Sequence, residues 1–317
     1  MKNPPIPKKI KRVLSNHNDK RIDWYYWLRD DDRKNKEILS YLNKENKYSE
    51  KWFKTNKVDS NKIFKYLKNS IPRFEESFKL KIDEYQYFST SSISQEYKKY
   101  YRIFKKEKKL ILDVNKLAKN KKYYDISSIF PSKNHKYIAF GEDTNGRREF
   151  SIVIKDINKN IFLEKHSCSS TGNIIWNKKS DGYFYLRKDP KSLIANSLFF
   201  HKLGEDEKND KLIYKEKDKQ FNLSISLSRT NKYLFLQISK TESNEIWYLD
   251  LDRQNLELNC FLKRENNHLY SIDDTPENFF VLSNKNKRKN FALYKTKLDK
   301  TSKIHWKLVI AHNKNEL

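Results

Sequence analysis

Glycine, cysteine and methionine are scarce in this 317-residue sequence, which has 5 Gly, 2 Cys and 1 Met. The two cysteines, Cys168 and Cys260, form neither a disulfide framework nor a zinc-binding spacing, so we expect two reduced thiols. So few glycines also exclude a glycine-rich loop that could cradle a phosphate. No apolar run approaches the roughly 18 residues that a membrane span needs. Because no apolar segment follows the basic N-terminus, we expect no signal peptide, no membrane partner and a cytoplasmic location.

Acidic residues are outnumbered, with 41 Asp and Glu against 67 Lys and Arg, which gives a net charge of +26. Such an excess can indicate a nucleic-acid partner. The lysines are nevertheless spread over the whole chain and interleaved with acidic residues, as in residues 105–109 (KKEKK) and 215–219 (KEKDK). A binding footprint would be concentrated, so we expect no nucleic-acid partner. A basic nucleic-acid-binding protein stays as a less favoured alternative.

Residues 1–70 have the pattern of helices, after an extended start that contains three prolines. Helical spacing relates the apolar residues Ile38, Leu42, Tyr48 and Trp52 in one run. A second apolar run covers residues 63–71 and ends before Pro72, and the residue before a proline disfavours helix. Residues 30–32, three consecutive aspartates, are expected to cap a helix rather than to act as catalytic acids or bases.

After Pro72 the chain has short aromatic and β-branched runs, which predict strands. The centres of these runs are Tyr87, Ile138, Phe184, Leu234 and Phe280, spaced by 51, 46, 50 and 46 residues. A second run follows each centre by about ten to fifteen residues. The second runs are at residues 101–104, 151–154, 198–200, 246–249 and 291–294.

A repeat of about 45–50 residues with several short strands is typical of β-propeller blades, and five such units fit the chain. Scarce glycine counts against this interpretation, although Asn and Asp can replace glycine in left-handed turns. The alternative is a β-sandwich with chance spacing. We predict a mainly β fold, an incomplete β-propeller preceded by an N-terminal helical arm.

Several segments resemble one family in order along the chain. The first is residues 17–31 (HNDKRIDWYYWLRDD), and the others are residues 141–148, 212–218, 268–271 and 283–296. Together they resemble the N-terminal part of the prolyl oligopeptidase family, in its oligopeptidase B branch. The resemblance implies a propeller of about seven blades, of which about five are present, capping an α/β-hydrolase domain. It implies a serine peptidase that cleaves short peptides after basic residues.

The domains implied are a helical arm at 1–72, which would pack on the hydrolase domain, and a partial propeller at 73–317. An α/β-hydrolase needs a Gly-x-Ser-x-Gly turn, and no two of the five glycines are four residues apart. We therefore expect no catalytic residue and no cofactor in this chain, which alone should be inactive. Its partner would be the α/β-hydrolase domain, in the same polypeptide or as a separate chain.

The seven histidines are scattered, and no two have the i, i+4 spacing of a helical metal site. We therefore predict no metal site and expect every histidine on a loop or at the surface. They are His17, His135, His166, His201, His268, His305 and His312.

Two groups of residues are candidates for contact with a hydrolase domain. The first is the aromatic block Trp24, Tyr25, Tyr26 and Trp27, whose alternative is the ordinary core of a small helical unit. A unit of about 70 residues has little core of its own, which favours docking.

The second group is Glu142, Asp143, Arg147 and Arg148. Its alternative is a solvated hairpin with surface ion pairs worth about 0–1 kcal/mol each. By resemblance, an arginine matching Arg148 lies near the hinge between domains and helps to bias open against closed forms. A freestanding propeller-like module that binds protein or peptide is the alternative to the whole interpretation.

Overall fold

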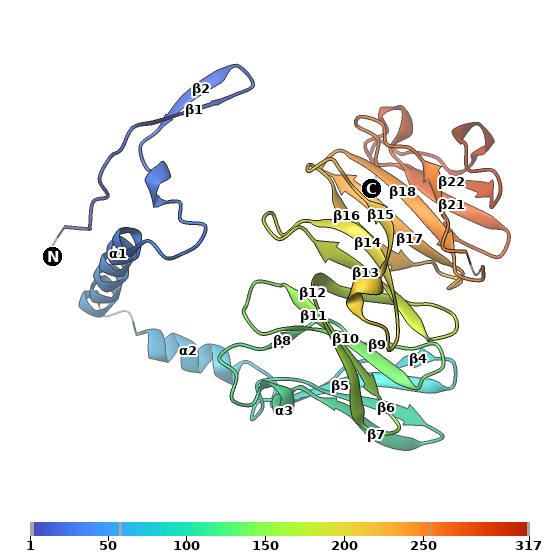
Figure 1. Cartoon of the computed structure of the whole chain (residues 1–317), viewed down its shortest axis with the longest axis horizontal. Helices are drawn as coiled ribbons and strands as arrows, with labels where there is room; N and C mark the ends of the chain where they lie inside the picture. Colours follow the sequence, from blue (N-terminus) through green and yellow to red (C-terminus); the bar gives the residue numbers. More distant parts are fainter. Residues whose placement is uncertain (1–2, 57–58, 254, 316–317) are drawn as a thin grey trace. The chain divides into compact units, whose positions relative to one another are not determined.

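The computed structural model describes residues 3–56, 59–253 and 255–315, and the chain divides into two compact units (Figure 1). The N-terminal unit is Met1–Arg73 and the C-terminal unit is Phe74–Leu317. The first carries the two longest helices and the second is built from antiparallel strands. In the described ranges, every helix is too short or too polar to cross a membrane.

The N-terminal unit opens with a hairpin, in which β1 (Arg12–Asn16) pairs with β2 (Asp19–Asp23). The turn residues His17 and Asn18 have φ of 50° and 63°, and a tight two-residue hairpin turn favours positive φ at both positions. The prediction of helix after an extended start is therefore wrong at β1 and β2. Both strands are mostly exposed, so they lack the alternation of buried apolar residues that marks a strand in a sequence.

The helical part of this unit consists of η1 (Tyr26–Leu28), α1 (Lys36–Thr55) and α2 (Ser60–Asn69). The apolar residues at helical spacing lie in α1 as predicted, and α2 ends before Pro72. The predicted cap is wrong, because Asn35 caps α1 by accepting hydrogen bonds from the backbone N–H groups of residues 37 and 38. Asp30 instead supports the capping residue, because its carboxylate accepts a hydrogen bond from the backbone N–H of Asn35 at 2.7 Å.

The strands of the C-terminal unit form four antiparallel sheets, which we divide into blades 1 to 5, because one eight-stranded sheet comprises blades 2 and 3. Blade 1 contains β3 (Phe74–Glu76), β4 (Leu80–Ile82), β5 (Tyr85–Ser92), β6 (Lys99–Phe104) and β7 (Glu107–Asp113), and is followed by α3 (Val114–Ala118). Blade 2 contains β8 (Asp125–Ile126), β9 (Phe130–Pro131), β10 (Tyr137–Asp143), β11 (Phe150–Asp156) and the first part of β12 (Ile161–Trp176). Blade 3 contains the last part of β12, β13 (Gly182–Lys188), β14 (Ala195–Lys202), η2 (Glu207–Asn209) and β15 (Lys211–Lys215).

Blade 4 contains β16 (Asn222–Leu227), β17 (Tyr233–Lys240), β18 (Ser243–Asp250) and β19 (Leu258–Leu262). Blade 5 contains β20 (Tyr270–Asp274), β21 (Asn278–Ser283), η3 (Lys285–Lys287), β22 (Ala292–Lys297), η4 (Lys303–His305) and β23 (Lys307–Ile310). Figure 1 shows the blades following one another from cyan through yellow to red. The predicted strand centres lie in β5, β10, β13, β17 and β21, so the repeat and the open propeller are confirmed.

Strand β12 joins blades 2 and 3 because its two ends pair with different neighbours. Its first part pairs with β11, where His166 lies opposite Ile152, and its last part pairs with β13, where Ile174 lies opposite Tyr185. The register is irregular between Ser170 and Ile174, where Gly172 has φ of 80°. A Cβ at Gly172 would lie 2.8 Å from the ring of Phe150, so the bend requires glycine for conformation and for space.

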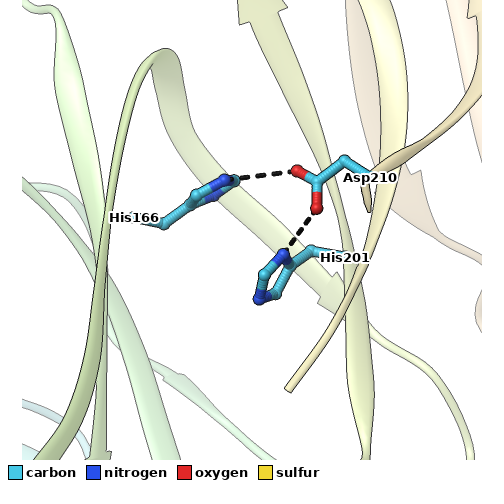
Figure 2. A group of neighbouring side chains, drawn as sticks. All are labelled: His166, His201 and Asp210. Carbon is cyan, nitrogen blue, oxygen red and sulfur yellow. Dashed lines mark hydrogen bonds and ion pairs between the residues drawn. The ribbon is translucent and has the colours of Figure 1, made fainter. Parts of the chain in front are cut away.

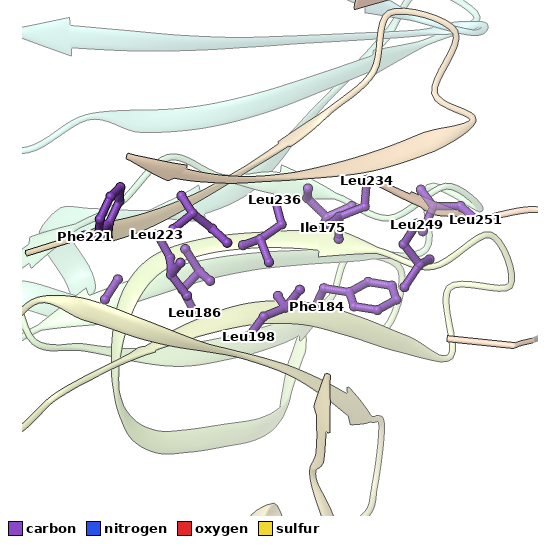
Figure 3. Close-up of a cluster of buried hydrophobic side chains, with 12 residues drawn as sticks. Ile175, Phe184, Leu186, Leu198, Phe221, Leu223, Leu234, Leu236, Leu249 and Leu251 are labelled. Atoms are coloured by element: carbon purple, nitrogen blue, oxygen red, sulfur yellow. The ribbon is translucent and has the colours of Figure 1, made fainter. Parts of the chain in front are cut away.

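Hydrophobic clusters fill the space between successive blades. The largest joins side chains of blade 3, including Phe184 and Leu198, to side chains of blade 4, including Leu234 and Leu236 (Figure 3). A second cluster joins blades 4 and 5, and a third joins blades 1 and 2. Since each blade buries apolar side chains against its neighbour, the blades hold one another in sequence.

The tight turns use few glycines, and other residues adopt the left-handed conformation instead. Asn120, Asn160, Asn231, Asn267 and Asp83 all have φ between 53° and 65°. Asn and Asp tolerate this region better than most residues because their short side chains can hydrogen-bond locally. The expected replacement of glycine by Asn and Asp is confirmed.

Candidate functional site

The aromatic block of the N-terminal unit separates into an inner and an outer pair. The indole N–H of Trp27 donates to the carbonyl of Lys8 at 2.9 Å, and its ring centroid lies 6.3 Å from that of Tyr41 in α1. The guanidinium of Arg12 lies 3.7 Å from the centroid of Tyr26. These contacts tie the hairpin and η1 to the rest of the unit, so the inner pair has a structural role.

The outer pair belongs to a large uncovered apolar surface. Trp24 and Tyr25 are each 41% exposed. Helix α2 has no buried residue, and its side chains of Phe64 and Leu67 are 63% and 58% exposed. Among the described residues of this unit, Ile38 is the only buried hydrophobic side chain. Exposed apolar surface of this extent marks an interaction site more often than a free surface.

Asp143 organises the turn between β10 and β11. Its carboxylate is fully buried and accepts three backbone N–H groups, from Asn145 at 2.9 Å, Gly146 at 3.0 Å and Arg148 at 2.7 Å. Arg148 itself adopts a positive φ of 56°. The bonds to Asp143 hold the turn in this unusual conformation, and Arg147 and Arg148 are exposed at its tip.

Glu142 is buried beside Asp143 and forms ion pairs inside blade 2. It pairs with Lys121 at 2.7 Å and also with Lys165 on β12. Burial alone would raise the pKa of Glu142, but the hydrogen bonds from these two ammonium groups outweigh it and hold the pKa below its ordinary value. Glu142 and Asp143 therefore shape the hairpin from within, while the two arginines are accessible.

A second group of polar side chains lies between β12, β14 and η2, where Figure 2 shows the carboxylate of Asp210 joined by dashed lines to both His166 and His201. Nε2 of His166 lies 3.2 Å from Oδ2 of Asp210, and Nδ1 of His201 lies 2.6 Å from Oδ1. Glu207 of η2 approaches Nε2 of His166 at 3.3 Å, and Glu164 approaches Nε2 of His201 at 3.3 Å. One donor atom from each of His166, His201 and Asp210 lies within 4.8 Å of the others.

The two imidazoles differ in charge preference. Burial lowers the pKa of His166, so its neutral form is favoured. Burial opposes protonation of His201 as well, but the hydrogen bond to Asp210 and the nearby carboxylate of Glu164 outweigh it and raise its pKa. The phenol of Tyr185 donates to Asp210 at 2.6 Å, and burial raises the pKa of Tyr185. A cavity of about 370 Å³ opens onto this group.

Comparison with known proteins decides the family. The model of the prolyl oligopeptidase N-terminal β-propeller domain matches residues 4–317. The chain belongs to the prolyl oligopeptidase family. This match agrees with the blades, with the arm and with the resemblance seen in the sequence.

Curated relatives of this family member are full-length peptidases. This chain is 27% identical to dipeptidyl aminopeptidase BI of Pseudoxanthomonas mexicana over 98% of this chain and 45% of that protein. It is 28% identical to Protease 2 of Moraxella lacunata over 95% of this chain and 45% of that protein. The chain thus spans a little under half the length of these relatives.

Solved structures of the family have the same fold. Oligopeptidase B from Leishmania major superimposes with a TM-score of 0.88 at 23% identity, over 98% of this chain and 46% of that one. Oligopeptidase B from Trypanosoma brucei, in a closed form with covalently bound antipain, gives a TM-score of 0.88 at 23% identity, over 98% and 47%. At this identity the likeness concerns the fold.

The histidines of this oligopeptidase-family chain are where sequence reasoning failed. The prediction of loop or surface positions is wrong for His166 and His201, which are buried on β12 and β14, whereas His135 and His268 lie on loops as predicted but are also buried. Each of the four has a buried hydrogen-bond or ion-pair partner, which offsets the loss of hydration: Tyr87 for His135, Asp210 for His166 and His201, and Ser283 for His268.

His166 and His201 are 35 residues apart in sequence and come from two strands, so no local spacing marks the pair. The signal that was available is the alternation along β12, where His166, Cys168 and Ser170 are buried and the residues between them are not.

Proposed function

We propose that this chain is the N-terminal arm and propeller of an oligopeptidase B-like serine endopeptidase that cleaves short peptides after basic residues. The family match over residues 4–317 is the observation that carries the proposal. The catalytic serine, aspartate and histidine would come from an α/β-hydrolase domain, in the same polypeptide or as a separate chain. This chain would restrict entry to short peptides and supply contacts between the domains.

The N-terminal unit is proposed to dock on the hydrolase domain. Among its described residues, the one buried hydrophobic side chain cannot stabilise about 70 residues against their conformational entropy. The exposed side chains of Trp24, Tyr25, Phe64 and Leu67 offer the apolar area that such docking would cover. The inner residues Tyr26 and Trp27 would hold this surface in shape through their contacts with Arg12 and Lys8.

The β10–β11 hairpin is proposed to contribute a polar contact between the domains. Arg147 and Arg148 are exposed at its tip, and Asp143 fixes the backbone that presents them. Arg147 lies 3.3 Å from Glu149 within the hairpin. A carboxylate on the hydrolase domain that pairs with Arg148 in the closed form would bias the open–closed equilibrium.

The first test measures hydrolysis of a fluorogenic arginine-containing peptide by two proteins. One is this chain alone, and the other is this chain joined to the catalytic half of Protease 2 from Moraxella lacunata. We expect no turnover by the chain alone, and turnover by the joined protein that a serine-directed inhibitor abolishes. Inhibitor-sensitive turnover by the chain alone would contradict the proposal.

A second test distinguishes docking from a freestanding binding module. Size-exclusion chromatography and a melting curve of the chain alone should show self-association, because the N-terminal unit exposes its apolar surface. In the joined protein, replacement of Phe64 and Leu67 by serine should weaken the closed assembly and lower turnover. Serine at the exposed Ile304 of blade 5 is the control, and it should change neither. A monodisperse chain that unfolds in one cooperative step would favour the freestanding module.

A further inference from the structure

Among the described residues, two ring nitrogens in the group around Asp210 are buried without a hydrogen bond: Nε2 of His166 and Nε2 of His201. His166 is 4% exposed, and among the described residues its Nε2 has no hydrogen-bond partner. Two carboxylate oxygens are nevertheless close to it, at 3.2 Å from Asp210 and 3.3 Å from Glu207. Both distances are short enough for a hydrogen bond. The hydrogen bond is therefore missing because of the direction of the contacts and not because of their length.

The separations around Nε2 of His166 agree with those between two ligands of one metal ion. In a hydrogen bond the acceptor lies along the N–H direction, at about 2.9 Å. In a tetrahedral zinc site the ion occupies that axis at about 2.0–2.1 Å, which places the other donor atoms about 3.3 Å from the nitrogen. The oxygens of Asp210 and Glu207 lie at that separation from Nε2 of His166.

The remaining ring nitrogens have the neighbours that metal-binding histidines need. Sγ of Cys168 lies 3.6 Å from Nδ1 of His166. Glu164 lies 3.3 Å from Nε2 of His201, whereas Nδ1 of His201 forms a hydrogen bond of 2.6 Å with Oδ1 of Asp210, which a metal ion at Nδ1 would replace. A group that accepts the N–H of the second ring nitrogen fixes the tautomer and the orientation of a metal-binding imidazole.

We propose that His166, His201 and Asp210 bind a divalent transition-metal ion of the zinc type, with Glu207 as the fourth ligand. The donor atoms would be Nε2 of His166, Nδ1 of His201 and carboxylate oxygens of Asp210 and Glu207. Two imidazoles favour zinc and its neighbours over magnesium and calcium, which prefer oxygen alone. The two carboxylates neutralise the charge of the ion, and the adjoining cavity gives it a path from solvent.

The ion would have a structural effect on the propeller. His166 lies on β12, which joins blades 2 and 3, whereas His201 lies on β14 and Asp210 follows η2. One ion held by all of them would cross-link the end of blade 2 to the β14–β15 connection of blade 3. Because the ion would bind the folded state and not the unfolded one, it would raise the melting temperature.

The test uses the whole 317-residue chain, freed of metal by a chelator. Equilibrium dialysis against Zn²⁺ measures the stoichiometry, and Co²⁺ serves as a spectroscopic probe, because tetrahedral Co²⁺ absorbs strongly in the visible range. We expect one equivalent of metal, a tetrahedral Co²⁺ spectrum that Zn²⁺ abolishes, and a higher melting temperature with Zn²⁺. Less than a tenth of an equivalent bound, or an octahedral Co²⁺ spectrum, would overturn the proposal.

Variants locate the site. His166→Gln should lower the affinity at least about tenfold, since even groups behind the ligands contribute about 10–100-fold. Glu207→Gln should also weaken binding, and this residue is exposed enough that the variant should fold even if His166→Gln does not. Glu205→Gln is the matched control, because Glu205 lines the same cavity but pairs with Lys202 at 2.8 Å.

The control should bind metal as the unaltered chain does. Unchanged affinity in Glu207→Gln and in a folded His166→Gln would overturn the proposal. Loss of binding on replacement of the exposed His305 by glutamine would also overturn it, because the metal would then be at an adventitious surface site.

Discussion

Replacing Leu234 with alanine would open a cavity in the core between blades 3 and 4. Leu234 is 0% exposed and belongs to the largest hydrophobic cluster. The change removes three buried carbon atoms at about 0.8 kcal/mol each, or about 2.4 kcal/mol. The unfilled cavity adds a further cost, so we expect a loss of about 3–5 kcal/mol. A whole domain is stable by only about 5–15 kcal/mol, so the variant should lose a large part of its stability.

Urea unfolding followed by circular dichroism measures this loss, and the slope of free energy against urea should not change. The matched control is Leu282→Ala on β21, where the side chain is 44% exposed and the expected change is about 0.5 kcal/mol or less. If Leu234→Ala destabilised the chain no more than Leu282→Ala, the idea that neighbouring blades hold each other through a packed core would be refuted.

Three further predictions concern single side chains. Asp143→Ala should lower the free energy of unfolding in urea by about 1–3 kcal/mol, since it leaves backbone N–H groups of a buried turn without their acceptor. The control, Asp189→Ala in an exposed turn, should lower it by less. Equal losses would contradict the role given to Asp143. The lowered pKa of Glu142 means that its ion pairs stabilise the fold above the ordinary pKa of 4.5, and that this contribution is lost as pH falls through the lower, folded value. Between about pH 7 and about pH 4, the free energy of unfolding should therefore change less in Glu142→Gln than in the unaltered chain. An identical change in both proteins would count against the ion pairs. Burial raises the pKa of Cys168 to about 12, so iodoacetamide should label this thiol only when the chain unfolds, and rapid labelling of the folded chain would disagree.

The blades could be predicted from the sequence because each one buries alternate residues of its middle strands between two neighbours. Ile138, Phe184 and Leu234 are all fully buried, and the recurrence of such apolar runs set the repeat of about 45–50 residues. The helix α1 was also predictable, since residues such as Ile38 and Leu42 recur at helical spacing.

The hairpin of β1 and β2 and the group around Asp210 could not be predicted in this way. The hairpin strands bury almost nothing, so hydrophobic periodicity carries no information about them. His166, His201 and Asp210 come together only because β12 lies beside β13 and β13 beside β14, a pairing that a sequence does not state. In the hairpin at residues 142–148, the sequence located the charges but did not distinguish buried Asp143 from exposed Arg148.

The most direct measurement of the central claim compares two substrates of the protein that joins this chain to the catalytic half of Protease 2. One substrate is a short arginine-containing peptide, and the other is a long, unfolded protein rich in arginine. The account predicts rapid cleavage of the peptide and little cleavage of the protein, because the propeller restricts entry. Cleavage of both at equal rates, as by the catalytic half alone, would contradict it.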